Sequence, residues 1–160
     1  MCDACVADPL THSFDPITMV KQTHVFYTTF KGTKDHTNIE SIYRHFKTYL
    51  DRIQGAPWIW IIDCRFLGSK QVSNINTAFK ILEKLGNQYH ESIQFMYLIN
   101  AGPIIKTCMQ VFAPLITKTF ANKILKLNGS PLELFEEFKK LGWSVPEVKP
   151  LINRIQKEFD

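Results

Sequence analysis

The sequence predicts an α/β fold in which a mostly parallel, twisted sheet is flanked by helices. Short runs of β-branched and aromatic residues alternate with longer segments whose apolar residues recur every three or four positions. Strands that alternate with helices are joined by crossover connections, which make neighbouring strands parallel. The run Trp58–Asp63 is almost wholly apolar, as is typical of a central strand that helices cover on both faces.

Each element follows from its local pattern. The predicted strands are 24–30, 58–63, 94–100 and 123–127. Helical periodicity predicts helices that begin near 36, 72, 104, 130 and 150, with the first ending before Gly55 and the second at Gly86. Val145–Pro146 is expected to be extended. A final short helix is expected over 150–159.

Two helices carry further signals. Ser130, Pro131 and Glu133 form a capping box with proline at the first helical position, which predicts a sharp helix start. Pro114 interrupts the apolar segment that follows Pro103. Because proline lacks an amide hydrogen, this segment should form two helices with a bend, a plausible lid over the sheet.

The length of 160 residues fits one domain, which we assign to 23–160, preceded by a flexible arm over 1–22. No signal peptide is evident and no segment approaches the roughly 18 apolar residues of a membrane span, so we expect a cytoplasmic protein. Cys2 and Cys5 have ligand spacing but no second pair, so reduced thiols are expected rather than a metal site.

Charge is unevenly distributed along the chain. The net charge of +4 comes without a basic run, which argues against nucleic-acid binding. Residues 92–132 contain no Asp or Glu, and their cations are Lys106, Lys118, Lys123 and Lys126. An apolar and purely cationic segment suits peripheral contact with anionic lipid. The alternative is an ordinary strand-helix-strand unit with solvated lysines.

No catalytic motif is found. The chain lacks a nucleophile elbow, a Walker loop, a dinucleotide fingerprint and a zinc-protease motif. His90–Glu91 has no nucleophile beside it. Asp63 ends a strand where α/β sites often gather, but a single carboxylate is more often a loop anchor or helix cap. We therefore expect neither an enzyme nor a bound metal or cofactor.

The ordered set of motifs resembles the CRAL-TRIO lipid-binding domain. The set comprises the strand ending in Asp63, the turn Tyr89-His90-Glu91, the strand end Ile99-Asn100-Ala101, the break at Ala113-Pro114-Leu115 and the strand opening Lys123-Ile124. The resemblance covers roughly residues 24–141. It implies a sheet with an apolar cavity under a mobile gate helix, holding one lipid for transfer or sensing.

The resemblance also implies a headgroup site and a cavity. In phosphoinositide-binding members a turn glutamate and a strand-opening lysine serve the headgroup, and these match Glu91 and Lys123. An ordinary salt bridge between the two is the alternative. The bound phospholipid, with phosphoinositide favoured, would be the ligand. The cavity residues expected are Trp58, Trp60, Ile62, Met96, Leu98, Met109 and Phe112.

Some features depart from the larger members of that family. Their helical N-terminal lobe is not found, so the cavity should be less enclosed. Trp58 and Trp60 replace small hydroxyl residues, so they either shrink the cavity or stack on an acyl chain, and choline-lipid binding is not expected. The segments Ile105–Thr107 and Leu115–Ile124 resemble the BCH subgroup, which implies an alternative function as a scaffold for small GTPases or their regulators.

Overall fold

The computed structural model describes residue 6 and residues 13–31, 39–68, 75–115 and 117–158, without the side chains of 75, 76, 111, 112 and 115. The elements are β1 (Asp15–Val20), β2 (Thr23–Thr29), α2 (Ile39–Arg52), β3 (Trp58–Asp63), α3 (Ile75–Tyr89), β4 (Ile93–Ile99), α4 (Pro103–Phe112), the 3-10 turn η2 (Ala113–Leu115), α5 (Lys118–Ala121), β5 (Ile124–Leu127), α6 (Pro131–Lys140) and α7 (Val145–Lys157). Cys2, Cys5 and the predicted starts of the first two helices, near 36 and 72, lie outside the described residues.

The strands form one sheet whose spatial order is the order of the sequence, β1-β2-β3-β4-β5. Strands β2 to β5 run parallel, and β1 pairs antiparallel with β2 at the edge. The predicted α/β class with a mostly parallel sheet is therefore confirmed. Crossovers between parallel strands are right-handed in nearly all proteins, and here they all step in one direction, so the helices between the parallel strands are expected on the same face.

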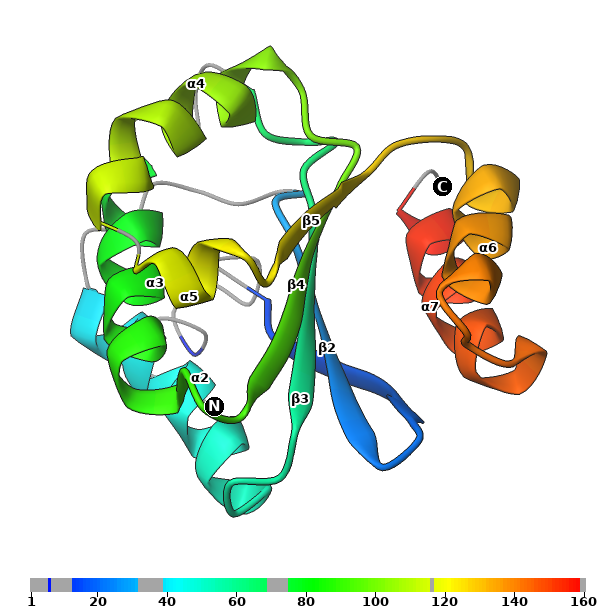
Figure 1. The fold of residues 1–160 in the computed structure, drawn as a ribbon, viewed down its shortest axis with the longest axis horizontal. Coiled ribbons are helices and arrows are strands. Elements are labelled where there is room, and N and C mark those ends of the chain that lie inside the picture. The colour runs from blue at the N-terminus through cyan, green and yellow to red at the C-terminus, as the bar shows by residue number, and fades with distance from the viewer. Residues whose placement is uncertain (1–5, 7–12, 32–38, 69–74, 116, 159–160) are drawn as a thin grey trace.

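Helices cover both faces of the sheet (Figure 1). Helices α2, α3, α4 and α5 lie on one face, which we call the α4 face, whereas α6 and α7 lie on the opposite face, which we call the α7 face (Figure 1). Strand side chains alternate between these faces. In β3, Trp58 and Trp60 join the core of the α4 face, and Ile59 and Ile61 join that of the α7 face.

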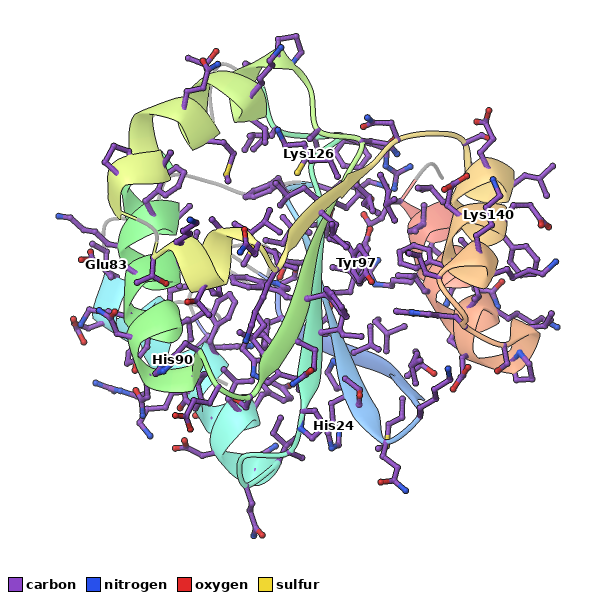
Figure 2. The ribbon with its side chains drawn as sticks, in the orientation of Figure 1. His24, Glu83, His90, Tyr97, Lys126 and Lys140 are labelled. Carbon is purple, nitrogen blue, oxygen red and sulfur yellow. The ribbon has the colours of Figure 1, made fainter. Side chains whose placement is uncertain are left out.

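The core of the α7 face is packed by two helices and several aromatic rings. Tyr97 of β4 points from the sheet toward α6 (Figure 2), where its ring centroid lies 5.4 Å from that of Phe138. Phe138 in turn lies 4.7 Å from Trp143. Leu134 and Leu151 are fully buried in the same cluster. This face is a closed structural layer that fixes the sheet.

The expectation of a flexible arm over 1–22 is wrong for its last part. Residues Asp15–Val20 form β1, and Phe14 before it is fully buried. The strand is joined to β2 by the two-residue turn Lys21–Gln22, in which both residues have positive φ. Such turns usually carry Asn-Gly, and a Lys-Gln pair gives no such signal.

The expectation that Val145–Pro146 is extended is also wrong. Helix α7 begins at Val145, five residues earlier than predicted, and continues through Pro150. Ser144 precedes it, with its main-chain amide and hydroxyl both donating to Oε2 of Glu147, at 2.7 and 2.6 Å. Oε1 of Glu147 also accepts from the main-chain amide of Lys21 at 3.0 Å, which attaches α7 to the β1–β2 turn.

Acidification should weaken the helix caps that Glu133 and Glu147 form. Hydrogen bonds from Ser130 and Ser144 hold the pKa values of Glu133 and Glu147 below their ordinary value of 4.5. Because the folded pKa is the lower one, this stabilisation is complete above the unfolded value and is lost as pH falls through the folded pKa. We expect the urea midpoint to fall between about pH 6 and about pH 3, and to fall less steeply in an E133Q/E147Q variant. An unchanged slope would contradict the capping role.

Candidate functional site

The α4 face carries most of the residues predicted to line a lipid cavity. Trp58, Trp60, Met96 and Leu98 all point to this face and are at most 5% exposed. Ile62 and Met109 are half-buried and pack against them. The side chain of Phe112 lies outside the described part of the structure. The sequence pattern therefore predicted that these residues share one face of the sheet. It did not predict whether they contact a ligand or one another.

The tryptophans belong to a packed aromatic cluster, formed by Phe14, Phe26, Phe46, Trp58 and Trp60. The ring of Phe14 lies 4.4 Å from that of Phe26 and 4.4 Å from that of Phe46, in centroid distance. Rings at this spacing bury large apolar areas and add specific ring-ring attraction. The cluster fills the space between β2, β3 and α2.

Both indole groups are satisfied within the protein. Trp58 Nε1 donates to Ser92 Oγ at 3.0 Å, and Trp60 Nε1 donates to Thr28 Oγ1 at 2.8 Å. A buried indole N–H that lost such a partner would carry a desolvation cost. The sequence left two alternatives, that the tryptophans shrink the cavity or that they stack on an acyl chain. Their packing and hydrogen bonds favour the first alternative.

The segment predicted to bend at Pro114 forms two helices with a break between them. Pro103 occupies the first turn of α4, and Pro114 lies in η2, after which α5 begins with Thr117 as its cap. The Thr117 hydroxyl accepts from the Phe120 amide at 3.3 Å, and the Phe120 ring is buried in the core of the α4 face. The short α5 is thus anchored to the sheet directly beside the proline break.

Some apolar side chains that pack against the core of the α4 face are only partly buried. Half-buried residues there, which we call the open strip, are Ile62, Ala101, Ile105, Met109 and Ile124. They come from the carboxyl end of β3, the segment after β4, helix α4 and strand β5. Apolar area that a protein leaves partly in water is area that an apolar ligand can cover.

Helix α4 leaves the sheet at a fixed point. Asn100 directly follows β4 and lies in the left-handed region with φ 54°, which Asn tolerates better than most residues. Its side-chain oxygen accepts from the Gly129 amide at 2.9 Å, which ties the start of the α4 segment to the turn after β5. The predicted strand end Ile99-Asn100-Ala101 is therefore the anchor from which the α4 segment extends.

Lys123 and Glu91 lie at the same loop. Among the described contacts, no ion pair joins them. The Lys123 ammonium donates to the carbonyl oxygens of His90 and Ile93, both at 2.6 Å. The side chain of Glu91 is 92% exposed, and its carboxylate lies 4.0 Å from His90 Nε2. Lys123 therefore holds the turn that carries Glu91. The ordinary salt bridge between the two is not formed.

The cationic side chains of this region face solvent. Lys106 of α4, Lys118 of α5 and Lys126 of β5 are all exposed. Lys126 is paired in register with Leu98, and Figure 2 shows it at the end of β5 nearest to α4. Because residues 92–132 contain no Asp or Glu, these lysines give this segment a net positive charge.

Asp63, the carboxylate at the end of β3, has a structural role. It is fully buried and accepts from the Tyr27 hydroxyl at 2.6 Å and from the Arg65 amide at 3.1 Å. Arg65 also forms an ion pair with it and donates to the Ile155 carbonyl oxygen of α7 at 3.0 Å. Burial, with the negative charge of Asp63 added, raises the pKa of Tyr27. Asp63 therefore anchors the following loop and α7.

Sequence reasoning missed the aromatic partners of the tryptophans. Phe14 was assigned to the flexible arm, and Phe26 and Phe46 to a strand and a helix without a shared site. The alternation of Phe26 with Tyr27 in β2 carried the relevant signal, because it fixes which face Phe26 occupies. No sequence signal placed Phe14 beside it.

Within the described ranges, no three His, Cys, Asp or Glu side chains are grouped so that they would hold a metal ion. The described helices are too short or too polar for any of them to cross a bilayer. Cys64 and Cys108 are free and buried, and burial raises the pKa of the Cys64 thiol to about 12. A thiol with so high a pKa is a weak nucleophile near neutral pH.

The family described as "Divergent CRAL/TRIO domain" matches residues 15–150. No curated protein matches the chain. A similar solved structure is "Crystal structure of Sfh5", with a TM-score of 0.58 at 12% identity. The match covers 76% of this chain and 49% of that one, so this chain spans about half the length of that protein. At this identity the likeness shows a shared fold.

Proposed function

Because the chain belongs to the divergent CRAL/TRIO domain family, we propose that it binds one anionic phospholipid on the α4 face, for transfer or sensing. Family membership supports lipid binding in general, and it argues against an enzyme. The observation that carries the proposal is the open strip, four of whose five residues belong to the segment 92–132, which carries four lysines and no Asp or Glu. A lipid offers an apolar chain and an anionic group that match these two surfaces.

Detection of a bound lipid is the decisive test. Protein purified from cells under gentle conditions is analysed by native mass spectrometry, and lipid exchange between vesicles is followed with the same preparation. We expect one phospholipid per chain and measurable exchange. A spectrum of ligand-free protein together with no exchange would overturn the proposal and favour the scaffold function instead.

We infer a preference for phosphoinositides from Lys123 and Glu91. An ammonium group has three donors, and two of those of Lys123 are used by main-chain carbonyls, so one remains for a phosphate oxygen. Glu91 lies on the loop that Lys123 holds, with its carboxylate free to accept from inositol hydroxyls. The headgroup would then bind at the amino-terminal end of β4.

Substitution of Glu91 should weaken the inositol contact without changing the stability of the fold. Because its side chain is 92% exposed, Glu91→Gln should leave the urea midpoint unchanged. We expect phosphatidylinositol binding to weaken by about fivefold, equivalent to about 1 kcal/mol, because the Gln oxygen still accepts from an inositol hydroxyl but the hydrogen bond is no longer charge-assisted. Binding of phosphatidic acid, which lacks inositol, is the control and should not change. Equal effects on both lipids would contradict the inositol contact.

We also propose that the lysines of α4 and α5 bring the domain to anionic membranes. A lysine near such a surface contributes about 1 kcal/mol, so a K106A/K118A variant should bind phosphatidylserine vesicles roughly 30-fold more weakly. The matched control is K149A/K157A, which removes two exposed lysines of α7 on the opposite side of the sheet. Equal losses in both variants would indicate attraction by net charge alone. Vesicle co-sedimentation at two salt concentrations measures the difference.

A further inference from the structure

The two edges of the sheet are protected to different degrees. An edge strand presents main-chain N–H and C=O groups that can pair with another strand, and proteins block such edges with proline, bulges or charged side chains. Strand β1 carries Pro16, and its register with β2 shifts between Pro16 and Thr18. Strand β5 contains no proline, its register with β4 is regular, and its one exposed side chain is that of Lys126. The β5 edge is therefore the less protected of the two.

The outer side of β5 presents main-chain groups that do not pair with β4. The carbonyl oxygens of Lys123 and Leu127 accept from main-chain amides of the β4 segment, both at 2.8 Å. Because successive residues of a strand direct their main-chain groups to opposite sides, Ile124 and Lys126 direct theirs away from β4. Among the described residues, no strand pairs with this side of β5. Figure 1 shows the sheet nearly edge-on, with helices to either side of β5 and none drawn across it.

The side chains along this edge differ between the two faces of the sheet. On the α7 face, Leu125 and Leu127 are half-buried. Phe95 of β4 lies on the same face, with its ring centroid 5.8 Å from that of Tyr97, and is 40% exposed. On the α4 face, Lys126 is exposed. A strand added to this edge would therefore place alternate side chains against an apolar row and against a cation.

Charge determines which kind of strand can be added. Residues 92–132 carry four lysines and no Asp or Glu, so a second copy of this segment would bring like charges together. An acidic side chain opposite Lys126 would instead form a cross-strand ion pair. The positions opposite Leu125 and Leu127 would favour apolar residues. The matching sequence is therefore an acidic residue between two apolar ones.

We propose that β5 binds an extended acidic segment of another protein, which adds to the five-stranded sheet as a further strand. The main chain of this segment would pair with Ile124 and Lys126. Its carboxylate would contact the Lys126 ammonium group, and its apolar side chains would cover Leu125 and Leu127. The proposal concerns the edge of the sheet, so it does not depend on lipid binding at the α4 face.

Hydrogen exchange of the full chain, followed for each amide by NMR, tests whether the edge is open. In the free protein the amides of Ile124 and Lys126 should exchange at least roughly tenfold faster than those of Leu125 and Leu127, which point to β4. Strong protection of the Ile124 and Lys126 amides in a monomer would overturn the proposal. The same protection in a dimer of the free protein would assign the edge to a second copy and would also overturn it.

Two peptides of the same composition test the sequence that the edge accepts. Acetyl-Thr-Val-Glu-Val-Glu-Val-Thr-amide has the required alternation, and acetyl-Thr-Val-Val-Val-Glu-Glu-Thr-amide lacks it. Titration calorimetry should show binding at least roughly tenfold tighter for the alternating peptide. This peptide should also slow exchange of the Ile124 and Lys126 amides. Equal binding of the two peptides, or slowed exchange only at other amides, would overturn the proposal.

Variants of one residue test the location. Lys126→Glu should weaken binding of the alternating peptide by roughly tenfold. The matched control is Lys149→Glu, an equal change of charge at an exposed position of α7, the helix that packs toward the β1 edge through Arg154 and Asp15. Equal losses in the two variants would reduce the effect to net charge and overturn the proposal. Lys126→Pro removes one outward amide and should abolish binding; if this variant does not fold, Lys126→Glu carries the test.

Discussion

Replacement of Asp63 by Asn should lower the free energy of unfolding by about 3 kcal/mol. The substitution keeps an oxygen that can accept from Tyr27 but removes the charge that balances Arg65, whose side chain is 12% exposed. Removing one partner of a buried ion pair leaves the other charge uncompensated, which costs more than the pair contributes. Arg65 also donates to α7, so the docking of that helix should weaken together with the sheet.

Urea unfolding followed by circular dichroism measures the effect. Asp51 is the matched control, because its carboxylate also accepts from a tyrosine hydroxyl, that of Tyr89 at 2.8 Å, and pairs with a cation, Lys47. Its side chain is 52% exposed, so Asp51→Asn should cost less than about 1 kcal/mol. Similar losses in the two variants would show that burial of the Asp63 pair has no special importance.

The elements predicted well are those in which the local pattern and the tertiary environment agree. Strand β3 has the bounds predicted for it, because a run of apolar residues can only be satisfied between two helical layers. The capping box at Ser130 is confirmed, with the Glu133 carboxylate accepting from the Ser130 amide at 2.7 Å. The break at Pro114 is also confirmed, since the missing amide hydrogen acts locally.

The elements missed depend on contacts between distant residues. Strand β1 pairs with β2 through a turn without glycine, and Asp15 is held by Arg154 of α7 at 3.3 Å. The start of α7 was predicted too late because Pro146 was assigned to an extended segment, although proline is accepted in the first turn of a helix. The hydrogen bonds of Lys123 to His90 and Ile93 join residues 33 and 30 positions apart, so no local pattern encodes them.

Phe14→Ala should lower the free energy of unfolding by about 3 to 5 kcal/mol, nearly as much as truncation of a central core residue. Phe14 precedes the edge strand, yet its ring is fully buried and lies within 4.4 Å of Phe26 and of Phe46, in centroid distance. Its removal would leave a cavity beneath both tryptophans. Met19→Ala, in the same strand but 48% exposed, is the control and should cost less than about 1 kcal/mol. Thermal and urea unfolding measure both variants. If Phe14→Ala unfolded like the control, the aromatic cluster would not depend on the segment before β1.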